Sequence, residues 1–437
     1  MAYDIEKPLS AAEYRDALWK GLGRTVLFVQ RYGDADYREE IVRGCICDLR
    51  FDRQTMQDHS DQLFDIIVAT GASDWYINHL TEVLPTLDSE QFDPWQAVAV
   101  LRRFAESGAL KARAAVIEAF DRDAANGNVE YLDDLLLVEG AQGLVRAARS
   151  LPWQSIKEDD QWRVWGAVEQ WSERDGHDAV RAQIRALLPA PTQLRPRFEY
   201  LEAKWLEVES RRDKRSWSNP VPTYDELVGL LDARVRRGRE SVLTYLFLPM
   251  KNVSPETVER LGRDLLDESD PLRRLGLVKA FRHRPFPFGH EPLMPFLESA
   301  DEDLRFVAMQ ALAKLRHPDI RQYALEGERT GLRPDLVAEM LKLNALPEDE
   351  SVLLDFARRE LDPKIYHSVT IGLLRLMESH SDIRSREICF QLYERGACSM
   401  CRTGIVDLLM KSGPLPEWIS AELPYDSERH TRELMPA

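Results

Sequence analysis

A ten-residue helical pattern that occurs six times constrains this chain more than any other feature. The copies are IVRGCICDLR (41–50), KARAAVIEAF (111–120), LRRLGLVKAF (272–281), LRFVAMQALA (304–313), IYHSVTIGLL (365–374) and MCRTGIVDLL (400–409). The fifth residue of each copy is small or compact, and the ninth is apolar. Positions one, five and nine lie on one stripe of an α-helix. A small residue in mid-stripe therefore predicts that a neighbouring helix approaches closely there.

The copies recur at a nearly constant spacing. Gly276 and Ala308 are 32 residues apart, and Val369 and Gly404 are 35 apart. The longer gaps, of 61 and 70 residues, each leave room for two repeats. A period of about 30–35 residues is typical of stacked helix pairs. The first helices of such pairs are predicted at 61–70, 94–106, 255–266 and 351–360, where amphipathic segments precede a turn.

Helix start signals are frequent, and strand signals are weak. Ser10 with Glu13, and Thr223 with Glu226, fit the capping box, in which a hydroxyl and a carboxylate satisfy free N–H groups. Four further sites place a capping residue before a proline at the first helical position: Asp93-Pro94, Ser254-Pro255, Asp270-Pro271 and Asp362-Pro363. No run of alternating β-branched residues lies between turns. The prediction is an all-α chain.

Two of the copies carry a more specific resemblance. One segment reads Asp301-Glu-Asp-Leu-Arg305 and is followed by Ala308, Ala311, Leu312 and Leu315. This pattern resembles the second helix of a HEAT-like repeat. A second copy looks to be present in Asp270-Pro-Leu-Arg273 with Gly276. The resemblance is best over about 255–345 and covers a family of repeat proteins that is common in bacteria. It implies a superhelical α-solenoid of stacked antiparallel helix pairs, HEAT- or armadillo-like, with a concave binding surface. In that family the turn aspartate and the early arginine help to lock adjacent repeats.

Changes in composition suggest four segments. Divergent helical repeats are expected over 1–188, an irregular joint with one long helix over 189–222, HEAT-like repeats over 223–412 and a capping tail over 413–437. The joint begins within LLPAPTQLRP (187–196), and its helix carries Phe198, Leu201 and Trp205 at helical spacing. The tail is expected to cover the last repeat through Leu415 and Trp418 and then to fray.

Bulk composition limits the class of protein. The chain has 437 residues, is 44% hydrophobic and 30% charged, and carries a net charge of −16. Its apolar runs are far shorter than the ~20 residues that cross a bilayer, and its N-terminus lacks an apolar signal region. We therefore expect a cytoplasmic protein without a membrane partner. The negative charge disfavours nucleic acid as a partner, unless basic residues gather on one face.

The C-x-x-C at Cys398 and Cys401 is the first candidate chemical site. Five cysteines in a chain of this length argue against a disulfide framework. Neither a second C-x-x-C nor a neighbouring histidine pair completes a zinc motif. Cys401 falls at position two of a repeat copy, and Cys45 takes the small mid-stripe position. The favoured reading is structural, with no metal and no cofactor; whether Cys398, at a helix start, is reactive stays open.

A tryptophan-rich segment has two readings. Trp162, Trp165 and Trp171 lie within EDDQWRVWGAVEQWSERDG. They predict either a bulky layer of the core or an aromatic binding surface, because tryptophan is enriched at binding hot spots. The neighbouring acids at 158–160 would give such a surface a rim suited to a basic partner.

Arginines form the second candidate surface. They occur at Arg211, Arg212, Arg215, Arg234, Arg236, Arg237, Arg273 and Arg305. Aligned along one groove they could follow a phosphate backbone or an acidic peptide. The simpler reading is a solvated face with helical ion pairs.

The sequence predicts a non-catalytic scaffold that binds a protein partner on the concave face of a solenoid. It contains no phosphate-binding loop, no nucleophile elbow and no metalloprotease motif, and no catalytic residue can be named. The alternatives are nucleic-acid or phosphate-ligand binding through 211–284, and an enzyme on a solenoid that resembles the alkylpurine DNA glycosylases of this fold. The partner and the oligomeric state are not readable from the sequence.

Overall fold

The computed structural model describes residues 7–57, 59–151, 158–189, 194–214, 221–244, 253–329, 331–383 and 385–434. Across these ranges the regular structure is entirely helical, so the all-α prediction is confirmed. The chain forms two compact units. Unit 1 holds 1–216, 397–403 and 415–437, and unit 2 holds 217–396 and 404–414.

Unit 1 contains the N-terminal helices and the C-terminal tail. Its elements are α1 (Ala11–Lys20), α2 (Arg24–Tyr32), α3 (Arg38–Ile46), α4 (Ser60–Ala69), α5 (Ser73–Val83), η1 (Leu84–Thr86), α6 (Pro94–Glu106), α7 (Leu110–Ala125), α8 (Leu132–Glu139), α9 (Ala141–Ser150), α10 (Glu158–Asp175), α11 (His177–Ala186), α12 (Arg195–Lys214), α24 (Glu417–Glu422), η6 (Leu423–Tyr425) and α25 (Arg429–Glu433).

Unit 2 contains the helices of the second half. They are α13 (Tyr224–Arg237), α14 (Arg239–Thr244), α15 (Pro255–Asp267), α16 (Pro271–Ala280), η3 (Met294–Glu298), α17 (Glu302–Leu312), α18 (Pro318–Arg329), α19 (Pro334–Leu341), η4 (Pro347–Asp349), α20 (Glu350–Arg358), α21 (Pro363–Ser379), η5 (Ser381–Ile383) and α22 (Arg386–Arg395). Helix α23 (Ser399–Lys411) has residues in both units.

The predicted caps form at nearly every site. Ser10 and Thr223 close full capping boxes. The side chains of Ser254, Asp270 and Asp362 accept backbone N–H groups at the starts of α15, α16 and α21. The local sequence therefore sets where these helices begin.

Asp93 is the exception among the predicted caps. Its side chain makes no capping bond to α6. It accepts instead from the backbone N–H of Asp48 at 2.7 Å and from Arg53 at 3.1 Å. A tertiary contact has replaced the local one.

The repeat copies form helices, with one correction. The mid-stripe residues Ala115, Ala308 and Val369 are buried in α7, α17 and α21. The first copy is helical only to Ile46, because Cys47 adopts extended backbone as the C-cap of α3. Leu49 is therefore outside the helix, although Cys45 occupies the predicted buried position.

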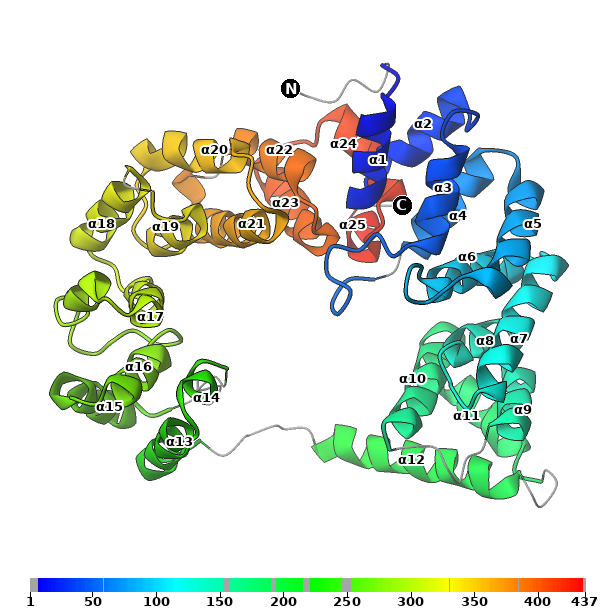
Figure 1. The fold of residues 1–437 in the computed structure, drawn as a ribbon, viewed down its shortest axis with the longest axis horizontal. Helices are drawn as coiled ribbons and strands as arrows, with labels where there is room; N and C mark the ends of the chain where they lie inside the picture. The colour runs from blue at the N-terminus through cyan, green and yellow to red at the C-terminus, as the bar shows by residue number, and fades with distance from the viewer. Residues whose placement is uncertain are drawn as a thin grey trace. The chain divides into compact units, whose positions relative to one another are not determined.

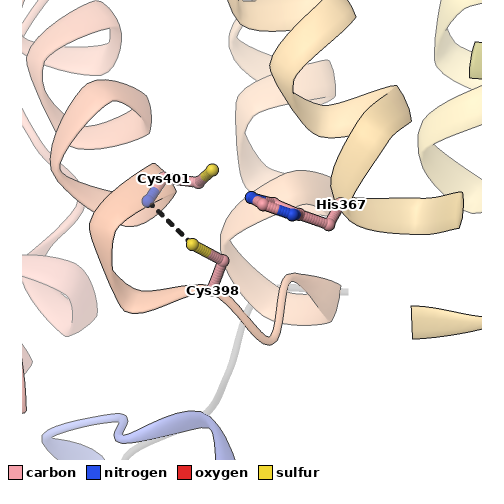
Figure 2. Close-up of side chains that lie close together, drawn as sticks. All are labelled: His367, Cys398 and Cys401. Carbon is pink, nitrogen blue, oxygen red and sulfur yellow. Dashed lines mark hydrogen bonds between the residues drawn. The ribbon is translucent and has the colours of Figure 1, made fainter. Parts of the chain in front are cut away.

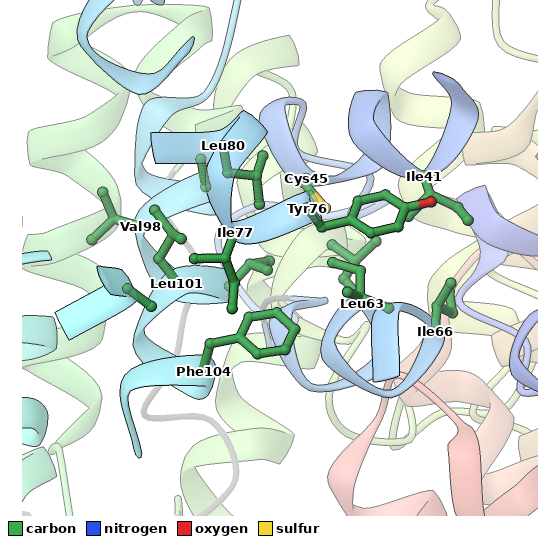
Figure 3. Packing of buried hydrophobic residues seen from close by; sticks show 14 of the residues in the cluster. Ile41, Cys45, Leu63, Ile66, Tyr76, Ile77, Leu80, Val98, Leu101 and Phe104 are labelled. Carbon is green, nitrogen blue, oxygen red and sulfur yellow. The ribbon is translucent and has the colours of Figure 1, made fainter. Parts of the chain in front are cut away.

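The core of unit 1 is built from apolar faces of successive helices. Figure 3 shows part of it, where Tyr76 and Ile77 of α5 pack among Leu63 of α4 and Leu101 and Phe104 of α6. A second cluster continues through α8–α12.

Helix α12 belongs to that second cluster. Phe198, Leu201 and Trp205 are buried in it together with residues of α10 and α11. The long helix predicted within 189–222 is therefore present, but it is part of unit 1 and does not form a separate joint.

The C-terminal tail contradicts the expected fraying. It forms α24, η6 and α25, and these red segments lie beside the blue helices α1 and α2 in Figure 1. Trp418 is mostly buried, and Ile419 and Leu423 are fully buried. Arg24 of α2 lies 2.9 Å from Glu422 in an ion pair. Buried apolar and charged contacts therefore hold the tail against the first helices of the chain.

The prediction that a small mid-stripe residue lets a neighbouring helix approach closely can be tested at Gly276 in unit 2. A Cβ atom on Gly276 of α16 would lie 2.4 Å from the side chain of Leu231 in α13. We expect Gly276→Val to destabilise unit 2 by about 1–3 kcal/mol through overpacking. Gly229→Ala in α13 is the matched control, because a Cβ there meets no atom within 4 Å. Chemical denaturation should show a loss for the first variant only; an equal response of both would contradict the close-packing role.

The helices of the described ranges include none that has both the length and the apolar character needed to span a bilayer.

Candidate functional site

The candidate site is a groove in unit 2 with a volume of about 580 Å³. This volume lies within the ~300–1,000 Å³ range of ligand sites. Its lining combines cationic, anionic and apolar side chains from successive helices. The residues are Arg282, His283, Phe306, Gln310, Lys314, Asp335, Leu336, Glu339, Ser368, Ile371, Gly372 and Arg375.

Helical periodicity places these residues along the groove. On α17 and just after it, Phe306, Gln310 and Lys314 are four residues apart and share one stripe. Helix α21 contributes Ile371 and Arg375 in the same way. Contacts run from α16 to α17, from α17 to α19 and from α19 to α21, and Figure 1 shows these helices in that order along unit 2.

Tight packing brings the two most C-terminal walls of the groove together. A Cβ atom on Gly372 of α21 would lie 3.0 Å from the Cβ of Ala338 in α19. Because a glycine stands at this contact, the backbones of the two helices approach closely. The groove is therefore defined by fixed helices.

The charges of the groove are unevenly compensated. Glu339 pairs with Lys314 at 2.9 Å, and Asp335 pairs with Arg333 at 2.7 Å. Arg282 and Arg375 form no ion pair with any residue of the ranges that the structure describes. The two carboxylates are thus committed within the protein, and two guanidinium groups remain available to a ligand.

The titration behaviour of nearby groups supports an electropositive site. Burial lowers the pKa of Lys342, and repulsion from Lys314 and Arg375 lowers it further, against opposing effects of Glu339 and Glu378. Burial also lowers the pKa of Arg282, against attraction from Glu339. Lys314, Lys342 and Arg375 therefore lie close enough to repel one another, and a bound anion would relieve that repulsion.

Apolar surface accompanies the cations. Phe306 is exposed over 39% of its surface, while Leu336 and Ile371 are half-buried. An exposed aromatic side chain between charged neighbours is typical of a binding anchor. The groove can thus hold an apolar side chain and an anionic group together.

The tryptophans predicted as a binding surface lie elsewhere. Trp171 is fully buried, and its indole N–H donates to Asp175 at 2.8 Å. Trp165 is also buried and packs edge-on against Trp205. The side chain of Trp162 lies outside the described residues. The hot-spot reading is therefore corrected for Trp165 and Trp171, because the bulky rings are used to fill the core.

The predicted arginine surface is divided. The side chains of Arg211 and Arg212, and the whole of Arg215, lie outside the described residues. Arg234, Arg236 and Arg237 are in the last turn of α13, where cations stabilise the carbonyl end of a helix. None of these three lines the groove.

Arg273 and Arg305 make contacts within the protein. Arg273 pairs with Asp232 of α13 and with Glu268 at 2.8 Å. Arg305 donates to the carbonyl of Ser299 at 2.5 Å. Arg273 thus links neighbouring helix pairs, whereas Arg305 caps its own turn, and neither is directed at a ligand.

The cysteines have structural surroundings. Figure 2 shows Cys398 at the start of α23, where its Sγ accepts the backbone N–H of Cys401 at 3.5 Å. Cys398 is only 7% exposed, which shields its thiol. Cys45 is fully buried, and burial raises the pKa of its thiol. The burial of Cys45 is what the packing prediction requires, whereas Cys398 and Cys401 also lie beside His367 of α21, with one ligand atom from each of the three within 4.8 Å of the others (Figure 2), so the structural interpretation of the C-x-x-C stays a prediction.

Two histidines that are distant in sequence meet beside an aspartate. The rings of His290 and His317 stack with centroids 3.6 Å apart. His290 Nε2 lies 3.1 Å from a carboxylate oxygen of Asp319, whose backbone N–H donates to His317 Nδ1. One ligand atom from each of the three groups lies within 4.8 Å of the others, so the cluster has the donor set of a candidate metal site as well as hydrogen bonds among its members.

Sequence reasoning reached Arg282 only as a member of the segment 211–284 and did not select Lys314 or Arg375, although a signal for all three was present. Arg282, Lys314 and Arg375 each follow directly after a repeat copy, at what would be position eleven. Positions three, seven and eleven form a second stripe along the helix. It lies about 200° around the helix axis from the buried stripe formed by positions one, five and nine. A basic residue recurring on the stripe opposite the core is the pattern that identifies this face.

No protein-family model matches the chain, and comparison with curated proteins finds no significant match.

Proposed function

We propose that this chain is a non-catalytic binding protein, a HEAT-like α-solenoid that holds a segment of a protein partner in the groove of unit 2. The observation that carries the proposal is the groove itself: successive helices present Phe306 together with Arg282 and Arg375 in one recess. Shape and an aromatic anchor would supply affinity, and the charged groups would set selectivity.

The repeat pattern supports the solenoid part of the proposal. Arg273 contacts Asp232 of the preceding helices, as the turn-and-arginine motif of HEAT-like repeats would require. The stacking of α16, α17, α19 and α21 through consecutive contacts is the arrangement expected of repeated helix pairs.

Nucleic-acid binding receives less support. Arg273 is committed to ion pairs within the protein, and Asp335 and Glu339 would face a phosphate backbone in the groove. The net charge of −16 opposes it further.

To test the proposal, a photo-crosslinking amino acid replaces Phe306 in the host cell, and the protein that it captures is identified. The complex is then reconstituted from the purified original chain and the purified captured protein. We expect a complex whose affinity falls about 10-fold or more in Phe306→Ala, since it loses a buried aromatic anchor. Leu266→Ala is the matched control, because Leu266 is a 50% exposed apolar residue on α15, outside the groove.

Two outcomes would overturn the proposal. One is a reconstituted complex that Phe306→Ala and Leu266→Ala weaken equally. The other is turnover of a substrate by the purified chain that Phe306→Ala abolishes, since the groove would then be an active site.

A further inference from the structure

We infer that the groove binds a short, extended, acidic peptide segment that carries an apolar side chain for Phe306. This inference rests on the proposed function and specifies its ligand. It is carried by three observations of unit 2: two cations without ion-pair partners in the described chain, an exposed aromatic side chain that lines the same groove, and the succession of helices on which these residues lie.

The cations define the charge of the ligand. Arg282 comes directly after α16 and Arg375 lies in α21, so they stand at the two ends of the succession α16, α17, α19 and α21. A guanidinium group forms bidentate hydrogen bonds with a carboxylate. Lys314, between them, is already paired with Glu339. A ligand with an acidic residue towards each end therefore fits the unpaired groups.

The succession of helices defines the length of the ligand. Neighbouring helices pack about 8–10 Å apart, so three such steps cover at most ~25–30 Å. An extended chain advances ~3.3 Å per residue. About eight residues are then the most that a segment needs to reach from Arg282 to Arg375, and such a segment would cross α17, which carries Phe306 and Gln310.

The remaining charges restrict the class of ligand. Asp335 and Glu339 line the middle of the groove, where a continuous phosphate backbone would place a negative charge at every step. A peptide can place an apolar residue there and its acids at the ends. The chain as a whole is strongly acidic, so an acidic ligand is attracted only within the groove and must be short.

The test uses a random octapeptide library displayed on phage and selected on the purified full-length chain. We expect enriched sequences to have a net negative charge relative to the input library and an apolar residue near the centre. The same selection on Arg282→Gln/Arg375→Gln should lose the acidic bias. A synthetic peptide of the enriched sequence should bind this double variant at least 10-fold more weakly, with a reduced dependence on salt.

Arg263→Gln/Arg358→Gln is the matched control. It removes the same charge from unit 2 at residues of α15 and α20 that are more than half exposed and lie outside the groove. We expect it to bind the peptide like the original chain, and circular dichroism melts should show that both double variants fold.

The inference would be overturned if the selection enriched neutral or basic peptides, or enriched no peptide. It would also be overturned if the two double variants weakened binding of the peptide equally. A fourth contrary result is that a single-stranded oligonucleotide binds more tightly than the peptide and that Arg282→Gln/Arg375→Gln abolishes this binding. If one of these results is obtained while Phe306→Ala still weakens the reconstituted complex, the inference about the ligand is wrong and the proposed function is retained. If Phe306→Ala leaves that complex intact, the proposed function falls instead.

Discussion

Replacing Arg402 by methionine is expected to destabilise unit 1 by about 3–5 kcal/mol, because it leaves a buried carboxylate without its partner. Arg402 is 1% exposed, and its Nε lies 2.6 Å from a carboxylate oxygen of Asp426. It also donates to the backbone carbonyl of Lys20 at 2.6 Å. The guanidinium of Arg402 thus connects α23, the C-terminal tail and the end of α1. In Arg402→Met, hydrogen exchange should become faster in α1 and in the tail.

The loss should depend on pH. Burial raises the pKa of Asp426, although Arg402 and the N–H of Glu428 oppose this. Without Arg402 the pKa rises further. A raised carboxyl pKa means that the folded state binds its proton more tightly, so stability falls as pH rises above the unfolded value of ~3.9. The free-energy difference between Arg402→Met and the original chain should therefore be smaller at pH ~5 than at pH ~8.

Two further variants separate the charge effect from the loss of packing. Arg402→Met/Asp426→Leu removes both charges and should recover much of the stability. Arg429→Met removes an exposed arginine of helix α25 that pairs with Glu433 across one turn, and it should change stability by less than about 0.5 kcal/mol. A loss in Arg402→Met that is the same at both pH values and is not recovered in the double variant would contradict the ion-pair explanation.

Local features of the fold were predictable from the sequence because they depend on local interactions. Ser10, Thr223, Ser254 and Asp270 cap helices where expected, since a short polar side chain reaches N–H groups two or three residues away. Buried mid-stripe residues such as Ala308 were likewise predicted, because the spacing of apolar residues identifies the buried side of a helix.

What failed depended on contacts between distant residues. Nothing near Asp93 indicates that it will bind the backbone of Asp48. Nothing in the tail indicates that its carboxylates will meet α2 and α23, since proline-rich, polar composition resembles that of a fraying terminus. The tryptophans were ambiguous for a related reason: indole is favoured both in cores and in interfaces, and only the packing of Trp171 decides between them.

The groove was partly predictable. The arginine count pointed to the segment 211–284, but most of the cations that the structure describes there pair within the protein or stabilise helix ends. Arg282 and Arg273 differ in their positions within the ten-residue repeat. Arg273 lies at position two and pairs with Asp232. Arg282 comes directly after position ten, on the stripe that lines the groove. Comparing equivalent positions between copies, rather than counting charges along the chain, identifies the face that lines the groove.

Removal of residues 415–437 is expected to be more damaging than any single substitution in unit 1. The tail supplies Glu422 to Arg24 and Asp426 to Arg402, and both arginines are at least 95% buried. It also covers apolar surface with Ile419 and Leu423. A chain that ends at Pro414 would expose that apolar surface and lose both ion pairs together with the buried side chains of Ile419 and Leu423, each of which contributes about 1.5–3 kcal/mol when fully buried. This loss is a large fraction of the stability of an ordinary domain, about 5–15 kcal/mol.

Hydrogen exchange with mass spectrometry tests this at the level of single helices, which matters because a chain of two units need not unfold in one step. Protection of α1 and α2 should be lost in the shortened chain, while α17 and α21 of unit 2 keep theirs. Arg429→Ala/Glu433→Ala keeps the tail and removes only an exposed ion pair, so it should leave every helix protected. Full protection of α1 and α2 without the tail would show that the N-terminal helices are stable by themselves, and the tail would then be only a cover for a core that is already complete.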